Sequence, residues 1–204
     1  MQNWRRRGIG TPAGWYTLVG IVMLGVSIWV PFLTAARTAR VELRADRIAS
    51  LLLEASLTVA GPIGDDDVDF VLARFHALAL RDGVHTADLE RVEPPLADTL
   101  LTLENKHYAF HLAVSPPHAT AVPGEGTDPA YEVMAWPREK VGPAHTAFFD
   151  PDDAPPAFTR NLNRNYHGFG AERPSPGRSH RHPSNVVDTR AFYRSIDDER
   201  WIVP

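Results

Sequence analysis

The chain contains no cysteine among its 204 residues. This excludes a disulfide framework, a cysteine-ligated zinc site and a thiol nucleophile. The chain also lacks an excess of one charge, since its formal net charge is −4. No basic field is available to attract nucleic acid, and we expect no nucleic-acid partner.

The short motifs of several enzyme classes are missing as well. There is no Gly-x-Ser-x-Gly elbow, no glycine-rich phosphate loop and no His-Glu-x-x-His pair. We therefore predict that the protein is not an enzyme. The alternative is a membrane-anchored enzyme whose active site is assembled from residues far apart in the chain.

One long hydrophobic run is present, from Trp15 to Ala36, and none of its 22 residues is charged. A bilayer core of about 30 Å requires about 20 apolar residues of helix, so we predict a transmembrane helix over 15–36. Aromatic residues near the ends of such helices lie at the membrane interface, and a proline in the last turns is tolerated. The predicted anchor residues are Trp15, Tyr16, Trp29 and Pro31.

The segment before this run, residues 1–14, carries the basic triplet Arg5-Arg6-Arg7. By the positive-inside rule, we expect a cytoplasmic N-terminus and a C-terminal domain outside the cytoplasm, anchored once in the cell (inner) membrane. The alternative is a cleavable signal peptide, with small residues for cleavage at Thr34-Ala35-Ala36. Its apolar core would be about 7–15 residues long, which is shorter than this run.

The helical pattern continues beyond the run, over residues 37–60. Six apolar residues follow one another at steps of four and three, as in a coiled-coil seam. They are Val41, Ala45, Ile48, Leu52, Ala55 and Val59. Gly61-Pro62 ends the pattern, so one helix is predicted from about Tyr16 to Ala60. The seam either covers the core of the chain's own soluble domain or also packs against neighbouring subunits in a homo- or hetero-oligomer.

Residues 61–170 are predicted to form a soluble α+β domain. Acidic residues from Asp65 onward favour the start of a second helix over about 66–81, because they complement the free N–H groups and the dipole there. Runs rich in β-forming residues predict strands at 100–103, 108–114, 131–136 and 145–149. The alternating positions expected to face the core are Tyr108, Phe110, Leu112, Tyr131, Val133, Ala135, Ala147 and Phe149.

The predicted fold class is therefore α+β, with a long N-terminal helix packed on one face of a small antiparallel sheet. A loop-rich tail, residues 171–204, completes the chain. Its stretch 172–184 has no apolar residue apart from proline and glycine and is expected to be mobile. Its end, from Phe192 to Val203, regains aromatic residues and is expected to dock on the domain.

A compact carboxylate loop follows the last predicted strand, with Asp150, Asp152 and Asp153. Hard oxygen ligands on a loop suit calcium, so these residues are the candidate ligands of a possible calcium ion. The alternative is a simple turn around Pro151 and Pro155. No other cofactor is expected.

The nine histidines suggest a second metal hypothesis. His107 and His111 are an even number apart and would lie on the same side of a strand. His180 and His182 flank Arg181 in a polar loop. Neither pair has a third ligand nearby in the sequence, so exposure or packing is the preferred interpretation and no bound transition metal is expected.

The order of these features resembles the type IV pilin-like proteins, including the pseudopilins of type II secretion. Arg5-Arg6-Arg7 precede Gly14, and then Trp15-Tyr16-Thr17-Leu18, an apolar helix, Pro31, an amphipathic helix and a sheet domain follow. The stretch Tyr131–Pro137, followed by His145–Phe149, is similar to the last strands of such domains. The resemblance implies processing at Gly14 and a calcium-binding loop in the sheet domain. The family's early helix glutamate has no counterpart, because no acidic residue occurs before Glu42.

These patterns lead to one functional expectation. The protein is expected to be a single-pass, membrane-anchored structural or assembly component of a cell-envelope or secretion machine, with the lipid bilayer as its first partner. The alternative is a membrane-tethered binding or sensing module that presents the loops after Asp150 and has no filament role.

Overall fold

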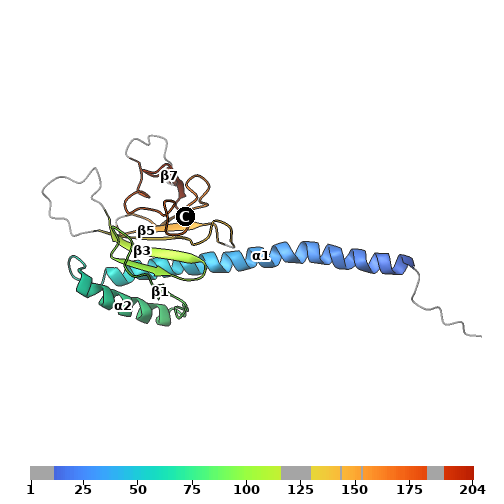
Figure 1. Cartoon of the computed structure of the whole chain (residues 1–204), viewed down its shortest axis with the longest axis horizontal. Coiled ribbons are helices and arrows are strands. Elements are labelled where there is room, and N and C mark those ends of the chain that lie inside the picture. Colours follow the sequence, from blue (N-terminus) through green and yellow to red (C-terminus); the bar gives the residue numbers. More distant parts are fainter. Residues whose placement is uncertain (1–11, 116–129, 143, 153, 183–190) are drawn as a thin grey trace, which may run out of the picture. The chain divides into compact units, whose positions relative to one another are not determined.

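The computed structural model describes residues 12–115, 130–142, 144–152, 154–182 and 191–204 (Figure 1). The triplet Arg5-Arg6-Arg7, most of the predicted loop 115–129 and Asp153 lie outside these residues. By its internal contacts the chain divides into two units, residues 1–39 and 40–204. The second unit therefore includes residues 171–204, which the sequence suggested as a separate tail.

Helix α1 spans Pro12–Ser56 without interruption, with Pro31 inside it. It ends four residues earlier than the sequence predicted. The amides of Thr58 and Val59 donate to the carbonyl oxygens of Ala55 and Ser56, which tightens the chain into turns. Gly61 follows at a φ of +91°, a conformation that favours glycine and stops the helix.

Helix α2 spans Val68–Arg81 and is preceded by the single 3₁₀ turn η1, Asp65–Asp67. The Asp67 carboxylate accepts a hydrogen bond from the Gly64 amide at 2.9 Å at the start of η1, but it makes no side-chain capping hydrogen bond to α2. The buried face of α2 consists of Val68, Val71, Phe75, Leu78 and Ala79. Phe70 and Leu80 lie outside this face and are 57% and 82% exposed.

Eight strands form one antiparallel sheet in the order β1-β2-β3-β4-β5-β6-β8-β7. The chain is a meander as far as β6, and the last two strands are added with β8 next to β6. The strands are β1 Glu90–Arg91, β2 Leu101–Glu104, β3 Tyr108–Val114, β4 Tyr131–Pro137, β5 Ala147–Pro151, β6 Ala157–Thr159, β7 Phe192–Arg194 and β8 Arg200–Ile202. The α+β class is confirmed, and the predicted strands 100–103 and 108–114 correspond to β2 and β3, which pair with each other.

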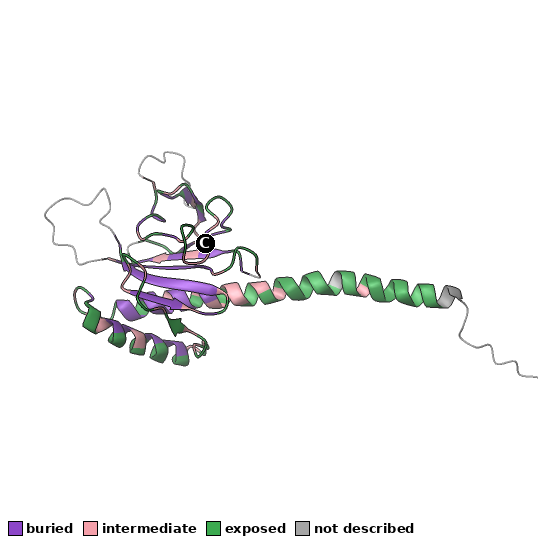
Figure 2. Ribbon diagram, in the orientation of Figure 1, coloured by how far each residue is buried: buried purple, intermediate pink, exposed green. Residues whose placement is uncertain are grey.

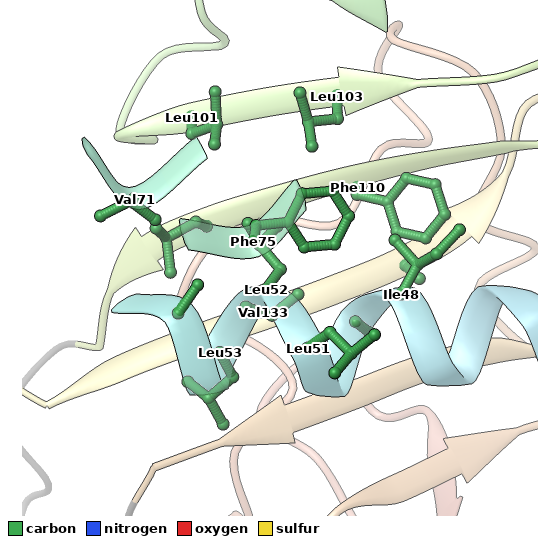
Figure 3. Close-up of a cluster of buried hydrophobic side chains, with 14 of the residues drawn as sticks. Ile48, Leu51, Leu52, Leu53, Val71, Phe75, Leu101, Leu103, Phe110 and Val133 are labelled. Atoms are coloured by element: carbon green, nitrogen blue, oxygen red, sulfur yellow. The ribbon is translucent and has the colours of Figure 1, made fainter. Parts of the chain in front are cut away.

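The first core lies between one face of this sheet and the two helices (Figures 1 and 3). The sheet contributes alternate residues of its strands to this core, because the pleat of a strand points every second side chain to the same face. They include Phe110 on β3, Val133 on β4 and both Leu101 and Leu103 on β2. Ile48, Leu51 and Leu52 of α1 pack against them with Phe75 of α2.

A second core fills the opposite face of the sheet, and the expected docking of the segment from Phe192 to Val203 takes place here. It contains Ala109, Met134, Trp136, Ala147, Phe149, Ala157, Tyr166, Tyr193 and Trp201. Ala147 and Phe149 therefore belong here and not to the helix-facing set, which corrects the predicted alternation. The C-terminal segment covers this face, so β4 is buried at all seven positions (Figure 2).

Candidate functional site: the apolar helix and the polar clusters

The apolar part of α1 is the only segment of the described residues that is long and apolar enough to cross a membrane. Among the described residues, none of its apolar window is buried (Figure 2). The predicted anchors Trp15, Tyr16 and Trp29 are 67%, 78% and 62% exposed. Such a continuous apolar surface requires a nonaqueous environment or a protein partner.

Polar groups within this part of α1 are satisfied by the helix itself. The Ser27 hydroxyl donates to the Met23 carbonyl oxygen at 2.8 Å. The Thr34 hydroxyl lies 2.8 Å from the carbonyl oxygen of Pro31 and 3.1 Å from that of Val30. Pairing of this kind allows hydroxyl groups, and a proline such as Pro31, to reside in a helix surrounded by lipid.

The predicted seam of α1 lies in the first core. Ala45, Ile48, Leu52 and Ala55 are at most 2% exposed, and Val41 and Val59 are partly buried against the same cluster. Their surface is therefore used inside the chain. An oligomer formed through α1 would have to use other residues, such as those of the apolar run.

Of the three predicted calcium ligands only Asp150 and Asp152 lie among the described residues, so the calcium site stays a prediction. Asp150 lies at the end of β5, where it interacts with Ser50 and Asp46 of α1. Asp152 is exposed, and Asp153 lies outside the described residues. Within the described part of the chain, no group of three or more His, Asp or Glu side chains is arranged to hold a metal ion.

Asp46 and Asp150 instead form a half-buried pair of like charges between α1 and β5. Burial raises the pKa of Asp46, and the nearby Asp150 carboxylate raises it further, while Arg47 opposes the change. Burial likewise raises the pKa of Asp150, although a hydrogen bond from Ser50 partly favours its ionised form. Ionisation of both carboxyl groups is therefore unfavourable in the folded unit.

Glu42 links α1 to the loop before β5. Its Oε1 accepts hydrogen bonds from the amide of Thr146 at 3.1 Å and from the Thr146 hydroxyl at 2.8 Å. The amide of His145 lies 3.3 Å from the same oxygen, and Arg160 Nη1 lies 3.7 Å from Oε2. The first acidic residue after the apolar run therefore holds two loops of the folded unit against the helix.

The four histidines of the metal hypothesis lie in different environments. His107 and His182 are half-buried, whereas His111 and His180 are buried. His111 is fully buried between the sheet and the second core, with its ring 5.2 Å from that of Trp136. Neither of its ring nitrogens has a hydrogen-bond partner among the described residues.

His180 belongs to a buried cluster that sequence reasoning missed. Its Nε2 lies 2.8 Å from Oε2 of Glu132 and 2.8 Å from the Ser115 hydroxyl. The other Glu132 oxygen accepts the Gly177 amide at 2.8 Å. Serine and glutamate contact the same ring nitrogen, whereas a nucleophilic relay needs them on opposite nitrogens. The cluster therefore fits a structural link between β4 and the C-terminal segment.

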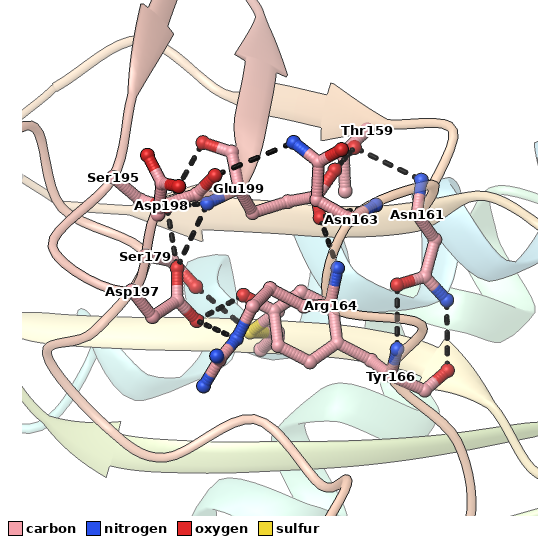
Figure 4. A network of polar contacts seen from close by, with 11 residues as sticks. Thr159, Asn161, Asn163, Arg164, Tyr166, Ser179, Ser195, Asp197, Asp198 and Glu199 are labelled. Carbon is pink, nitrogen blue, oxygen red and sulfur yellow. Dashed lines mark hydrogen bonds and ion pairs between the residues drawn. The ribbon is translucent and has the colours of Figure 1, made fainter.

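A second missed network fixes the C-terminal strands (Figure 4). The buried Glu199 carboxylate accepts hydrogen bonds from the Thr159 hydroxyl at 2.6 Å and from the amide of Arg164 at 2.7 Å. The Asn161 side chain pairs in both directions with the Tyr166 backbone, at 2.6 and 2.8 Å. The only sequence signal for this network was the density of Asn and Asp residues, which favour turns but do not reveal their partners.

A surface depression with a volume of ≈ 170 Å³ lies between the β4–β5 loop and the loop after β6. Lys140, His145 and Arg160 contribute cationic or titratable groups to it, and Leu162 contributes an apolar one. Comparison of the chain with models of protein families, with curated proteins and with solved structures finds no match. The function is therefore argued from these residues.

Proposed function

We propose that the protein is a single-pass membrane protein with a structural or assembly role, in which residues 15–36 cross the bilayer and residues 40–204 form a folded domain outside the cytoplasm. The observation that carries the proposal is the contrast within α1. Its first half exposes apolar side chains continuously, while the seam of its second half is buried in a protein core. One helix thus combines an exposed apolar segment, long enough to span a bilayer, with a segment that packs in a protein core, as expected of the anchor of a bitopic protein.

The pilin-like role within this proposal rests on the order of features in the sequence. A basic leader, a glycine at position 14, an apolar helix, an amphipathic helix and an antiparallel sheet follow one another. Partners in such an assembly would meet the exposed apolar residues of α1, since the seam is already occupied. A binding or sensing module on a plain anchor is the alternative, and the depression beside Lys140 and Arg160 favours it.

Membrane extraction and protease accessibility test the anchor. The protein should resist carbonate extraction, and external protease should cleave the C-terminal domain in spheroplasts. Replacing Val22 and Leu24 with arginine should release the protein, because each charge at the centre of a membrane helix costs about 2.5–3.5 kcal/mol on insertion scales. The matched control is Leu80→Arg, at an exposed position of α2, which should remain in the membrane. Extraction of the unmodified protein by carbonate would refute the anchor.

The intact mass of the protein purified from membranes separates the two roles. Processing after Gly14 supports the pilin-like assembly role, and an intact Met1 end supports a plain anchor carrying a binding module. A mass that begins after Ala36 would instead identify a cleaved signal peptide.

A further inference from the structure

Two loop tips carry the most exposed large apolar side chains of the folded unit. Val141, in the loop between β4 and β5, is 85% exposed, and Leu162, in the loop after β6, is 83% exposed. The two tips are neighbours, because Leu162 and Lys140 line the same depression. Large aliphatic side chains at adjacent loop tips are costly in water unless another phase or partner receives them.

Cationic side chains accompany these two tips. Lys140 precedes Val141, while Arg160 and Arg164 flank Leu162. Glu139 is an acidic residue of the β4–β5 loop, Arg160 lies 3.7 Å from Glu42, and Arg164 lies 3.8 Å from Asp197. The combination of exposed aliphatic groups with lysine and arginine is typical of protein surfaces that meet anionic lipid headgroups.

Only a short length of chain separates the apolar run from the residue that contacts these loops. Ala36 is the last apolar residue of that run, and Glu42 follows six residues later. Even a fully extended segment of this length spans at most about 22 Å, and a helical one spans about 9 Å. Glu42 binds the backbone of the β4–β5 loop at Thr146 and lies beside Arg160. The loops are therefore tethered within reach of the bilayer surface.

We propose that the tips of the β4–β5 loop and of the loop after β6 dock on the membrane surface. In this arrangement Val141 and Leu162 enter the interfacial region, and Lys140 and Arg160 bind the phosphates of anionic headgroups. The inference rests on the proposed function, because it requires residues 15–36 to span the bilayer. It adds a second, electrostatic contact between the folded unit and the lipid.

Single-cysteine labelling of the full chain tests this docking, and the absence of native cysteine makes the labelling specific. Val141→Cys, Leu162→Cys and Leu80→Cys are each labelled with an environment-sensitive fluorophore and reconstituted in vesicles. The vesicles contain phosphatidylcholine alone or a mixture with phosphatidylglycerol. Leu80 is the matched control because it is equally exposed, at 82%, but lies on α2.

We expect labels at 141 and 162 to emit at shorter wavelength in the anionic vesicles and to be quenched by brominated lipid, whereas the label at 80 does neither. Lys140→Gln should reduce the shift at 141 in anionic vesicles and leave it unchanged in neutral ones. Quenching at 141 and 162 that is no greater than at 80 would overturn the inference. So would a blue shift without bromolipid quenching, because it would indicate a protein contact.

Flotation of the same vesicles on a density gradient keeps the two proposals apart. Labelled protein that floats with the vesicles while its loop labels stay water-exposed leaves the anchor intact and removes the docking. Protein that does not float refutes the anchor itself, and the docking falls with it.

Discussion

His111 is the residue whose environment departs furthest from its sequence context. It is fully buried on β3, with Thr102 and Met134 as its neighbours on the flanking strands. Burial lowers the pKa of His111, the Glu132 charge opposes this change and the Arg173 charge reinforces it, so that the pKa is about 4. The imidazole is therefore neutral at physiological pH, and its protonation is incompatible with the packed second core.

We expect His111 to make the protein sensitive to acid. The folded-state pKa lies below the unfolded value of 6.5, so stability is complete above that value and is lost as the pH falls toward about 4. The loss attributable to this residue is about 3 kcal/mol at the acidic limit. His111→Leu should flatten this part of the profile, measured by urea unfolding of the detergent-solubilised chain, while His145→Gln at an exposed position should not. Parallel profiles for the wild type and His111→Leu would exclude this residue as the cause.

The contribution of Asp46 to stability should change with pH in the opposite direction to that of His111. Its raised pKa means that its contribution to stability is present below the ordinary aspartate value and is lost as the pH rises through the folded value. We predict that Asp46→Asn raises the melting temperature at neutral pH and leaves it unchanged in strong acid, because asparagine cannot ionise. Asp66→Asn, at an exposed position, is the control. A lower melting temperature for Asp46→Asn at neutral pH would show that its charge is needed.

At the scale of elements, α1 has a buried face and a solvent-exposed face within the folded unit. Leu52 is completely buried in the first core, whereas Arg47 lies on the outside and pairs with Asp82. That pair holds the pKa of Asp82 below its usual range, chiefly through the hydrogen bond from Arg47. Exposed ion pairs of this kind contribute only about 0–1 kcal/mol.

Leu52→Asp should therefore be far more damaging than Arg47→Ala. An unpaired carboxylate in the first core should cost several kcal/mol and prevent stable folding, while loss of the Arg47 pair should cost less than about 1 kcal/mol. Thermal melts and expression levels of the two variants measure this difference, and Leu52→Met is the conservative control at the same site. Equal effects of the two substitutions would mean that the seam is misassigned.

At the scale of the whole folded unit, the two cores share one sheet. Strands β3 and β4 place alternate residues into each core, so the same two strands contribute to both cores. Trp136 and Trp201 report on the second core, where both are fully buried. We infer that residues 40–204 unfold as one cooperative unit.

This coupling is testable through a substitution in the first core. Leu52→Ala should cost about 2–5 kcal/mol and lower the urea midpoint of the tryptophan emission change, although both reporting tryptophans lie on the other face of the sheet. Leu43→Ala, at a 69% exposed position of the same helix, should leave the midpoint nearly unchanged. If Leu52→Ala left the urea midpoint of the tryptophan emission change unaltered, the two cores would unfold independently.

Local patterns in the sequence determined the features that depend on neighbouring residues. The length of the apolar run predicted a helix able to span a membrane, and the three-four spacing predicted the face of α1 that is buried. The alternation of β-forming residues predicted β2 to β5 with small errors at their ends. Each of these signals repeats every two to four residues, so it can be read without knowledge of distant contacts.

Only the tertiary structure decided the features that depend on residues far apart in the chain. The second core exists because the C-terminal segment returns to cover the sheet, and the polar stretch expected to be mobile contributes His180 to it. His180 meets Glu132 across 48 positions of sequence, and Asp150 interacts with Ser50 of α1. A polar residue in a loop has the same local pattern whether its partner is water or a buried carboxylate. The choice between these partners is made by packing and desolvation, which act only after the chain has folded.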